Sequence, residues 1–443
     1  MGELFECGAW ETRPAPLGEV SLYDADLILT REILGPYGYF FRGAVWADID
    51  QDGCSDILPM GHGPPEAEND PGAYIYWLIP GRQAGTIVVD ERMQGLVADI
   101  DYHSMEHSAV GDMDGDGARD DWVFGAQGGS SYDPDGSTGA VYLFSEIHGV
   151  ETVDDATATL WPPPDWLFWT EDLDVGDLDG DEVDDLVVGG GYDGSYIDQG
   201  FVTVFSSPWE QEMSFFDAVA SIEGQGTWGT IVSVESDLNG DGLRDLVAAD
   251  RTGYDAFVSV FMGPVVGVFV PEDADLMLVG GGDGTGAGLA GGADANGDGY
   301  DDLLIGTGRD SSGPVSLLLG PFDESTTLNG AVAVIQGGGW DGTFSLAQDL
   351  DADGFPDLLI GDDHSTVFGH QPAGAAGLFY GPVSGSLGLM DADAWFHIED
   401  PDATANPGDW VAGLGDTDGD GFDDILIGTD TRGPAYLFRG GPR

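Results

Sequence analysis

The chain has 443 residues, 82 of them acidic and 12 basic, so its formal net charge at pH 7 is −70. All of the basic residues are arginine, since lysine is absent. This charge argues against nucleic acid as a partner, because phosphate contacts need a basic surface, and an anionic membrane would repel the protein unless calcium bridged the two.

The first residues give little sign of targeting. Residues 1–19 are predicted to be an N-terminal tail, and its opening, MGELFECGAW, is acidic without an apolar core, so no secretory signal peptide is visible. The stretch DADLILTREI, from Asp24, resembles a fourth strand of a repeat that has no earlier strands. No apolar segment approaches the ~18 residues of a membrane-spanning helix, so no transmembrane segment is expected.

An aspartate-rich stretch then recurs along the chain, and we number its seven copies loops 1 to 7. In order they read DIDQDGCSD, DMDGDGARD, DLDGDEVDD, DLNGDGLRD, DANGDGYDD, DLDADGFPD and DTDGDGFDD. Their first aspartates are separated by 64, 65, 60, 57, 55 and 67 residues. Self-similarity at such a spacing indicates a repeat architecture.

The segments around each loop read as four strands. A short apolar run ending near glycine follows the loop, as in LVVGG, LLIGT and ILIGT, and is typical of a buried strand. A glycine-led alternating strand comes next, as in GAVYLF and GPAYLF, and then a more polar one, such as AVASIEG. A last short strand, such as GTIVSV, leads into the next loop, and no convincing amphipathic helix occurs.

Seven such units predict an all-β fold over residues 20–443, a seven-bladed β-propeller of four-stranded antiparallel blades. Radial stacking lets neighbouring sheets cover each other's faces, which a lone four-stranded sheet cannot achieve. The final repeat stops after its third strand, AYLFRGG from Ala435. We expect the N-terminal strand to pair with it, completing the last blade and removing an exposed edge.

The spacing of the loop aspartates predicts a cation site. Alternate carboxylates at the first, third and fifth positions can converge on one ion, and a glycine at the sixth supplies a sharp turn. An EF-hand loop would need a bidentate glutamate at its twelfth position. That position is apolar or proline in all seven copies: Pro59, Val123, Val188, Ala248, Ile305, Ile360 and Ile427.

The ion is therefore expected to be completed by the ninth-position aspartate and by the backbone carbonyl of the seventh residue. The candidate ligands are Asp48, Asp50, Asp52, Cys54 and Asp56 in loop 1; Asp112, Asp114, Asp116, Ala118 and Asp120 in loop 2; Asp177, Asp179, Asp181, Val183 and Asp185 in loop 3; Asp237, Asn239, Asp241, Leu243 and Asp245 in loop 4; Asp294, Asn296, Asp298, Tyr300 and Asp302 in loop 5; Asp349, Asp351, Asp353, Phe355 and Asp357 in loop 6; and Asp416, Asp418, Asp420, Phe422 and Asp424 in loop 7.

Hard oxygen ligands in a flexible loop favour Ca²⁺, up to seven ions with one per blade, over magnesium or zinc. The loops are not equal, since Asn239 and Asn296 each replace a carboxylate. Loop 3 fits least well, because Glu182 replaces the turn glycine and a side chain is costly at positive φ. The alternative is seven polar turns that hold no metal.

The combined pattern, DxDxDGxxD followed by DLLIG and GxVYLF, resembles the FG-GAP repeat of the integrin alpha-subunit head and of bacterial secreted repeat proteins. The resemblance covers the chain from about residue 20 to its end and implies a seven-bladed propeller with calcium in loops on one face, used for recognition. The Phe-Gly pair itself is poorly kept: Trp228-Gly229 approximates it, while Thr343-Phe344 and Gly408-Asp409 depart from it.

Two stretches imitate catalytic motifs. His103, Glu106 and His107 spell HxxEH, a zinc-peptidase pattern, but a strand is expected there, and residues four apart in a strand lie ~13 Å apart. GAGLAG, from Gly286, matches GxGxxG, yet no helix follows it, and we interpret it as a flexible turn between blades.

The two cysteines, Cys7 and Cys54, could form a disulfide between the tail and the first blade or remain free thiols. Loops that fill only when calcium is abundant favour an extracellular, cell-surface or periplasmic location.

The predicted function is a non-catalytic, calcium-binding recognition or adhesion module, a monomer with an unidentified protein or glycan ligand. Aromatic segments such as WPPPDWLFW, from Trp161, and GYDGSYIDQG, from Gly191, could stack on sugars or fill the core. They keep open a lectin-like propeller, or a polysaccharide-active enzyme that uses loops at the propeller face.

Overall fold

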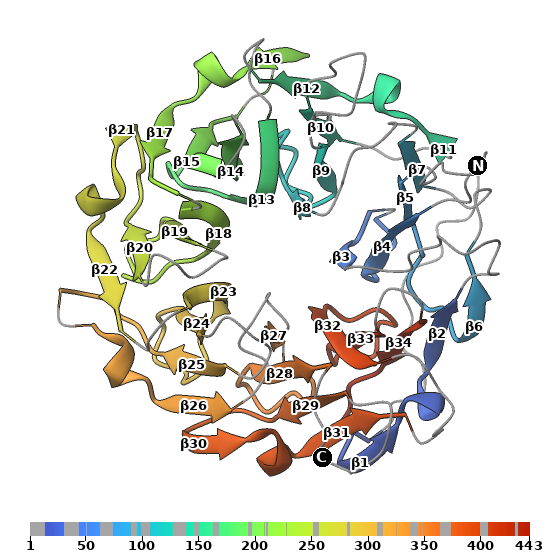
Figure 1. Cartoon of the computed structure of the whole chain (residues 1–443). Helices are drawn as coiled ribbons and strands as arrows, with labels where there is room; N and C mark the ends of the chain where they lie inside the picture. The colour runs from blue at the N-terminus through green and yellow to red at the C-terminus, as the bar shows by residue number, and fades with distance from the viewer. Residues whose placement is uncertain are drawn as a thin grey trace.

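The computed structural model describes residues 14–30, 44–49, 51–62, 74–89, 95–98, 107–126, 139–145, 150–162, 168–193, 197–207, 209, 211–226, 228–250, 257–280, 284–307, 313–324, 326–336, 344–347, 349–363, 374–398, 406–429 and 433–443. Within these residues the regular elements are strands and three-residue 3₁₀ turns. The strands form seven sheets arranged in a ring, which confirms the predicted seven-bladed β-propeller (Figure 1).

Each blade contains the four antiparallel strands that the repeat predicts, which follow one another from the inner strand outward. Blade 1 has β3 (Ala44–Ala47), β4 (Asp56–His62), β5 (Tyr74–Trp77) and β7 (Gly95–Ala98); blade 2 has β8 (Ser108–Gly111), β9 (Asp121–Ala126), β10 (Ala140–Phe144) and β12 (Ala158–Trp161); blade 3 has β13 (Phe168–Gly176), β14 (Asp185–Asp193), β15 (Ile197–Phe205) and β17 (Ala220–Glu223); blade 4 has β18 (Trp228–Ser236), β19 (Asp245–Asp250), β20 (Phe257–Phe261) and β22 (Leu276–Val279).

The remaining blades follow the same order. Blade 5 has β23 (Thr285–Ala293), β24 (Asp302–Thr307), β25 (Pro314–Leu318) and β26 (Ala333–Gln336); blade 6 has β27 (Phe344–Ala347), β28 (Asp357–Asp362), β29 (Ala375–Phe379) and β31 (Ala394–His397); blade 7 has β32 (Pro407–Leu414), β33 (Asp424–Thr429), β34 (Ala435–Phe438) and β2 (Leu27–Thr30). The inner strands contact one another around the ring, and β32 contacts β3 to close it.

The burial of the strands explains their sequences. The second strands β9, β19, β24 and β33 are buried at every residue, as their apolar runs predict. Neighbouring blades cover both of their faces, so these strands show no alternation. The outer strands β12, β17, β22 and β26 alternate between buried and more exposed residues, because only one face of each packs on the core.

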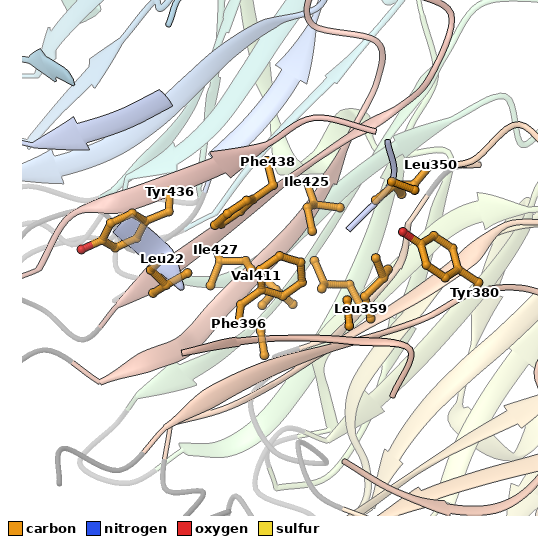
Figure 2. Close-up of a cluster of buried hydrophobic side chains, with 14 of the residues drawn as sticks. Leu22, Leu350, Leu359, Tyr380, Phe396, Val411, Ile425, Ile427, Tyr436 and Phe438 are labelled. Atoms are coloured by element: carbon orange, nitrogen blue, oxygen red, sulfur yellow. The ribbon is translucent and has the colours of Figure 1, made fainter. Parts of the chain in front are cut away.

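Ring closure occurs as the sequence predicts. The N-terminal strand β2 pairs antiparallel with β34, with Leu27 opposite Leu437 and Leu29 opposite Ala435. Just before β2, Leu22 is buried with Tyr436, Phe396 and other side chains of blades 6 and 7 (Figure 2). Residues 15–19, which the sequence assigns to the tail, also contact this region, since the Ala15 amide donates to the Pro442 carbonyl at 3.2 Å.

A fifth, parallel strand on six of the sheets is a feature that the sequence analysis missed. The strands are β1 (Gly18–Ser21) on β31, β6 (Gly85–Val88) on β2, β11 (Val150–Glu151) on β7, β16 (Glu212–Ser214) on β12, β21 (Gly267–Phe269) on β17 and β30 (Gly385–Gly388) on β26. Each precedes the fourth strand of one blade and pairs with the outer strand of the preceding blade; all but β1 also follow the third strand of their blade in the chain. The outer edge of each such blade is therefore covered by its neighbour.

Five of these fifth strands lead directly into a short 3₁₀ turn and then into the outer strand. The turns are η1 (Leu22–Asp24), η2 (Val153–Asp155), η3 (Phe215–Asp217), η4 (Pro271–Asp273) and η6 (Leu389–Asp391); η5 (Leu328–Gly330) lies at the same place in blade 5. An aspartate closes four of the turns by accepting the amide hydrogen of the residue before the turn, as Asp155 does from Thr152.

The prediction that GAGLAG is a turn between blades is wrong, because the stretch lies within the inner strand β23. Gly286 has φ +84°, and a Cβ atom there would lie 2.7 Å from the Cβ of Ala249 in blade 4. Gly229 and Gly408 have φ +85° and +82° and lie at the same kind of β-bulge in their own inner strands. The glycines let neighbouring blades approach closely.

The closing strand yields a first prediction. Leu29 is fully buried in β2, so Leu29→Ala should lower the unfolding free energy by about 3 kcal/mol, through lost burial and a residual cavity. Val88→Ala in β6, whose side chain is 48% exposed, is the control and should cost less than about 0.5 kcal/mol. Urea unfolding measures both, and equal costs would contradict the closing role of β2.

Candidate metal centres

Loops 1 to 7 connect the inner strand of each blade to its second strand. The ninth-position aspartate is the first residue of the second strand in six blades, as Asp185 is of β14 and Asp424 of β33. In blade 2, Asp121 begins β9, because loop 2 has one residue more than the others. Asp120, predicted as the ninth-position ligand, instead accepts a hydrogen bond from Gln51 Nε2 in loop 1, at 2.7 Å.

The first aspartate of every loop lies within a cradle of backbone amides. In loop 7, Asp416 Oδ1 accepts from the amides of Asp418, Gly419 and Asp420 at 2.6–3.2 Å, and Oδ2 accepts from Gly421 at 2.8 Å. The corresponding aspartates of loops 1 to 6 each accept the amide of the sixth residue in the same way. The loop backbone thus holds its shape around this carboxylate.

Two residues in each loop have left-handed backbone conformations. The fourth and sixth positions of loop 7 are Gly419, at φ +76°, and Gly421, at φ +90°. Glu182 takes the sixth position of loop 3 at φ +70°, as the sequence predicts, so loop 3 is strained there. Gln51 and Ala352 hold the fourth position at φ +54° and +55°, a constraint that the sequence analysis did not identify.

The ninth-position aspartate ties its loop to the end of the third strand. Asp424 is fully buried; its Oδ2 accepts from the Thr417 amide at 3.0 Å and its Oδ1 from the Gly440 amide at 2.9 Å. Asp245, Asp302 and Asp357 make the same two bonds in blades 4, 5 and 6. Burial raises the pKa of Asp424, Asp302 and Asp357 to about 7 and that of Asp245 to about 6.

Loops 2 and 3 leave one oxygen of this aspartate unsatisfied. Asp121 Oδ1 and Asp185 Oδ1 are buried and have no hydrogen-bond partner among the described residues. Desolvation raises the pKa of Asp121 to about 6 and that of Asp185 to about 7. Ser145 near Asp121, and Ser206 and the Ser207 amide near Asp185, favour the charged forms, but none of them lies in good hydrogen-bond geometry with these oxygens.

The carboxylates of loops 2 and 3 are close enough to share an ion. One oxygen each from Asp112, Asp114 and Asp121 lie within 4.8 Å of one another, and those of Asp177, Asp179 and Asp185 do so in loop 3. Three hard anionic ligands match the donor set that Ca²⁺ prefers. Loops 2 and 3 therefore fit a calcium ion.

Loops 6 and 7 bring together the first, third and fifth positions instead. The grouped side chains are Asp349, Asp351 and Asp353 in loop 6 and Asp416, Asp418 and Asp420 in loop 7. In loops 4 and 5 the third residue is asparagine, and Asn239 Nδ2 and Asn296 Nδ2 each donate to the fifth-position aspartate, at 3.1 and 3.0 Å. The described carboxylates of loops 1, 4 and 5 form no such group.

Loop 1 is only partly described. Asp50 lies outside the described residues, while Asp48 accepts the amides of Asp52 and Gly53, both at 2.8 Å. Cys54 is disulfide-bonded, and the other cysteine of the sequence, Cys7, lies outside the described residues.

Neighbouring loops contact one another around the ring, and the sequence did not predict these contacts. The seventh-position side chain of one loop covers the fourth-position glycine of the loop before it, as Val183 covers Gly115 and Tyr300 covers Gly240. The eighth residue adds hydrogen bonds, since Asp184 Oδ2 accepts the Asp112 amide at 2.9 Å. The seventh residues, predicted to offer only backbone carbonyls, thus connect the loops of successive blades.

A second candidate site lies away from the loops. His107 Nδ1 lies 3.2 Å from Asp172 Oδ1, and both line a cavity of about 150 Å³ with Ala44, Val45, Met60, Tyr76 and Ser108. Asp172 Oδ2 also accepts the Val232 amide at 3.0 Å, which fixes the carboxylate. No sequence motif could have indicated this pair, because 65 residues separate its members. His103 and Glu106, the rest of HxxEH, lie outside the described residues.

The aromatic segments singled out for sugar binding are only partly described, since residues 163–167 and 194–196 lie outside the described residues. Trp161 ends the outer strand β12 and is 41% exposed, with its Nε1 donating to Glu212 Oε2 at 2.6 Å. It therefore lies at the rim of the blade.

Comparison with known proteins adds little to this geometry. No protein-family model matches the sequence, so the FG-GAP resemblance has no support from that source. Among solved structures, the crystal structure of the exotype rhamnogalacturonan lyase YesX is similar, with a TM-score of 0.43 and 13% identity over 94% of this chain and 76% of that chain. A likeness at this level carries no inference about activity.

Among the described segments, no helix has the length and apolar character needed to span a bilayer.

The ninth-position aspartates predict the pH dependence of the metal-free protein. Their pKa rises from 3.8 in the unfolded chain to about 6 or 7 in the fold, so the fold favours their protonated form. The unfolding free energy of metal-stripped protein should therefore fall as the pH rises from about 4 to about 7, by on the order of 1 kcal/mol per aspartate. Urea unfolding across this range tests the sign, and a rise in stability would contradict it.

Proposed function

We propose that the protein is a calcium-stabilised propeller that acts outside the cell as a non-catalytic recognition or adhesion module for a protein or glycan ligand. The observation that carries the proposal is the convergence of three carboxylates in loop 2 and in loop 3, where Asp121 and Asp185 are buried. The FG-GAP-like spacing of the loops and the strongly acidic composition agree with an extracellular, calcium-rich setting.

The residues of the chain prepare these sites before any ion arrives. The amide cradle fixes the first aspartate, and the start of the second strand fixes the ninth. A bound calcium ion supplies positive charge that offsets the repulsion among the carboxylates. Because each loop also contacts the next, stabilising one loop stabilises the junction between two blades.

A rigid ring suits recognition, since its connecting segments can vary while the blades hold their positions. The ligand-binding surface is proposed to lie on segments that connect the blades. A glycan array in calcium, with a turnover assay on the same sugars, tests this function. Binding without turnover is expected, and bond cleavage would contradict a non-catalytic role.

The second candidate function is a polysaccharide-active enzyme, favoured by the His107–Asp172 pair in its cavity. A carboxylate that orients an imidazole is a common arrangement for a general acid or base. If any glycan is cleaved, His107→Gln should reduce the turnover number by 10²-fold or more. His397→Gln in the outer strand β31 is the control and should leave turnover unchanged.

Calcium should stabilise the fold. Because an ion that binds only the folded state adds about 2.7 kcal/mol per site at a hundredfold excess over its dissociation constant, stripping calcium should lower the melting temperature by several degrees. Asp179→Ala should reduce the calcium stoichiometry by one, whereas Asp154→Ala, at an exposed position in η2, should not. Differential scanning calorimetry and titration calorimetry measure these effects, and an unchanged melt after chelation would refute the proposal.

A further inference from the structure

Two arginines near the end of the chain enter the acidic groups of loops 6 and 7. Arg439 Nε lies 3.0 Å from Asp418 Oδ2, and the two side chains are only 4% and 1% exposed. Arg443 pairs through Nε with Asp351 and through Nη2 with Asp353, and its guanidinium lies 4.5 Å from the centre of the Tyr380 ring. Each group of three carboxylates thus contains a side-chain cation.

Comparison of the blades shows that Arg439 is specific to blade 7. The residue before the glycine that caps the ninth-position aspartate is Met262 in blade 4, Leu319 in blade 5 and Tyr380 in blade 6, and it is Arg439 in blade 7. These four residues correspond to one another because each precedes the glycine whose amide donates to the ninth-position aspartate of its blade. The cation is therefore an addition to the repeat, placed over the third-position aspartate of the loop.

Arg439 also connects the segments that close the ring. Its Nη2 donates to the Gln83 carbonyl at 3.1 Å, just before β6, and its amide donates to Asp26 Oδ2 at 3.1 Å, just before β2. One residue thus holds together loop 7, the closing strand and the first blade. Tyr380, under Arg443, donates its hydroxyl to the Pro16 carbonyl at 2.8 Å, so the N-terminal segment is held at the same place.

We propose that Arg439 and Arg443 are the resident cations of loops 7 and 6, which therefore bind no calcium in this protein. The Arg443 guanidinium forms ion pairs with Asp351 and Asp353, and that of Arg439 with Asp418, so each group already contains the positive charge that a metal would supply. A divalent ion added beside it would meet a positive charge at contact distance. The inference rests on the proposed calcium function and limits it to the remaining loops, so the region where the ring closes stays neutralised when calcium is removed.

The test counts calcium ions by titration calorimetry on metal-stripped protein and variants. Arg443→Met removes the cation from loop 6 at a side chain that is 36% exposed, and we expect it to gain one calcium per chain. Arg443→Lys keeps a positive charge and should gain none. Asp351→Ala should leave the stoichiometry of the wild type unchanged, whereas Asp114→Ala in loop 2 should reduce it by one.

Arg439→Met is the matching variant in loop 7, and the exposed Arg443 keeps the test valid if the buried substitution prevents folding. A wild type that binds seven ions and loses one on Asp351→Ala would overturn the inference and leave the proposed function intact. A wild type that binds none, with one gained on Arg443→Met, would refute calcium binding in loops 2 and 3 and support the inference. No binding in either protein would overturn both.

Discussion

The buried carboxylate at the start of each second strand is the interaction on which the rest of the structure depends. In blades 4 to 7 its two oxygens accept one amide from the loop before it and one from the end of the third strand. It therefore fixes three segments of the blade with a single side chain. Placing an acid in a desolvated position is costly, and the paired amides are what make the charged form tolerable there.

The same residue explains why the loops differ. Where a glycine amide reaches the second oxygen, as Gly440 does at Asp424, the carboxylate is satisfied by the protein alone. At Asp121 and Asp185, serines stand near the second oxygen and favour the charged form, but they lie outside good hydrogen-bond geometry with it. Small changes at the end of the third strand thus change how the buried carboxylate is held. Loops of nearly identical sequence can therefore differ in the hydrogen bonds that their buried carboxylate accepts.

The architecture could be predicted from the sequence because its signals are local and repeated. The apolar runs of β19, β24 and β33 predict buried strands, and the sequence of β2 predicts a strand without the earlier strands of its blade. With seven copies of the repeat, a closed ring is the arrangement that buries all of these strands. The fifth strands could not be predicted in this way, since β11 has two residues and its partner lies in another blade. The recurring Asp-Ala pair that ends five of the six described 3₁₀ turns was the available signal.

The site was less predictable than the fold. Spacing alone located the aspartates, but the extra residue in loop 2 moved the buried position from Asp120 to Asp121. The pair of His107 with Asp172, and that of Arg439 with Asp418, join residues from different strands, so no motif contains them. Such pairs become visible only once the strands have been placed beside one another.

The pairing of β2 with β34 has a consequence for how the molecule reaches its folded state. Leu27 and Leu437 are 410 positions apart, yet they are neighbours in one sheet. Bringing such distant segments together carries a loop-closure entropy that only the already assembled blades can reduce, by holding the two segments near each other. Blade 7 is consequently expected to be the last to form. In the intermediate that precedes it, the ring is open and has an unpaired strand edge. In that state the chain is most prone to associate with another copy of itself.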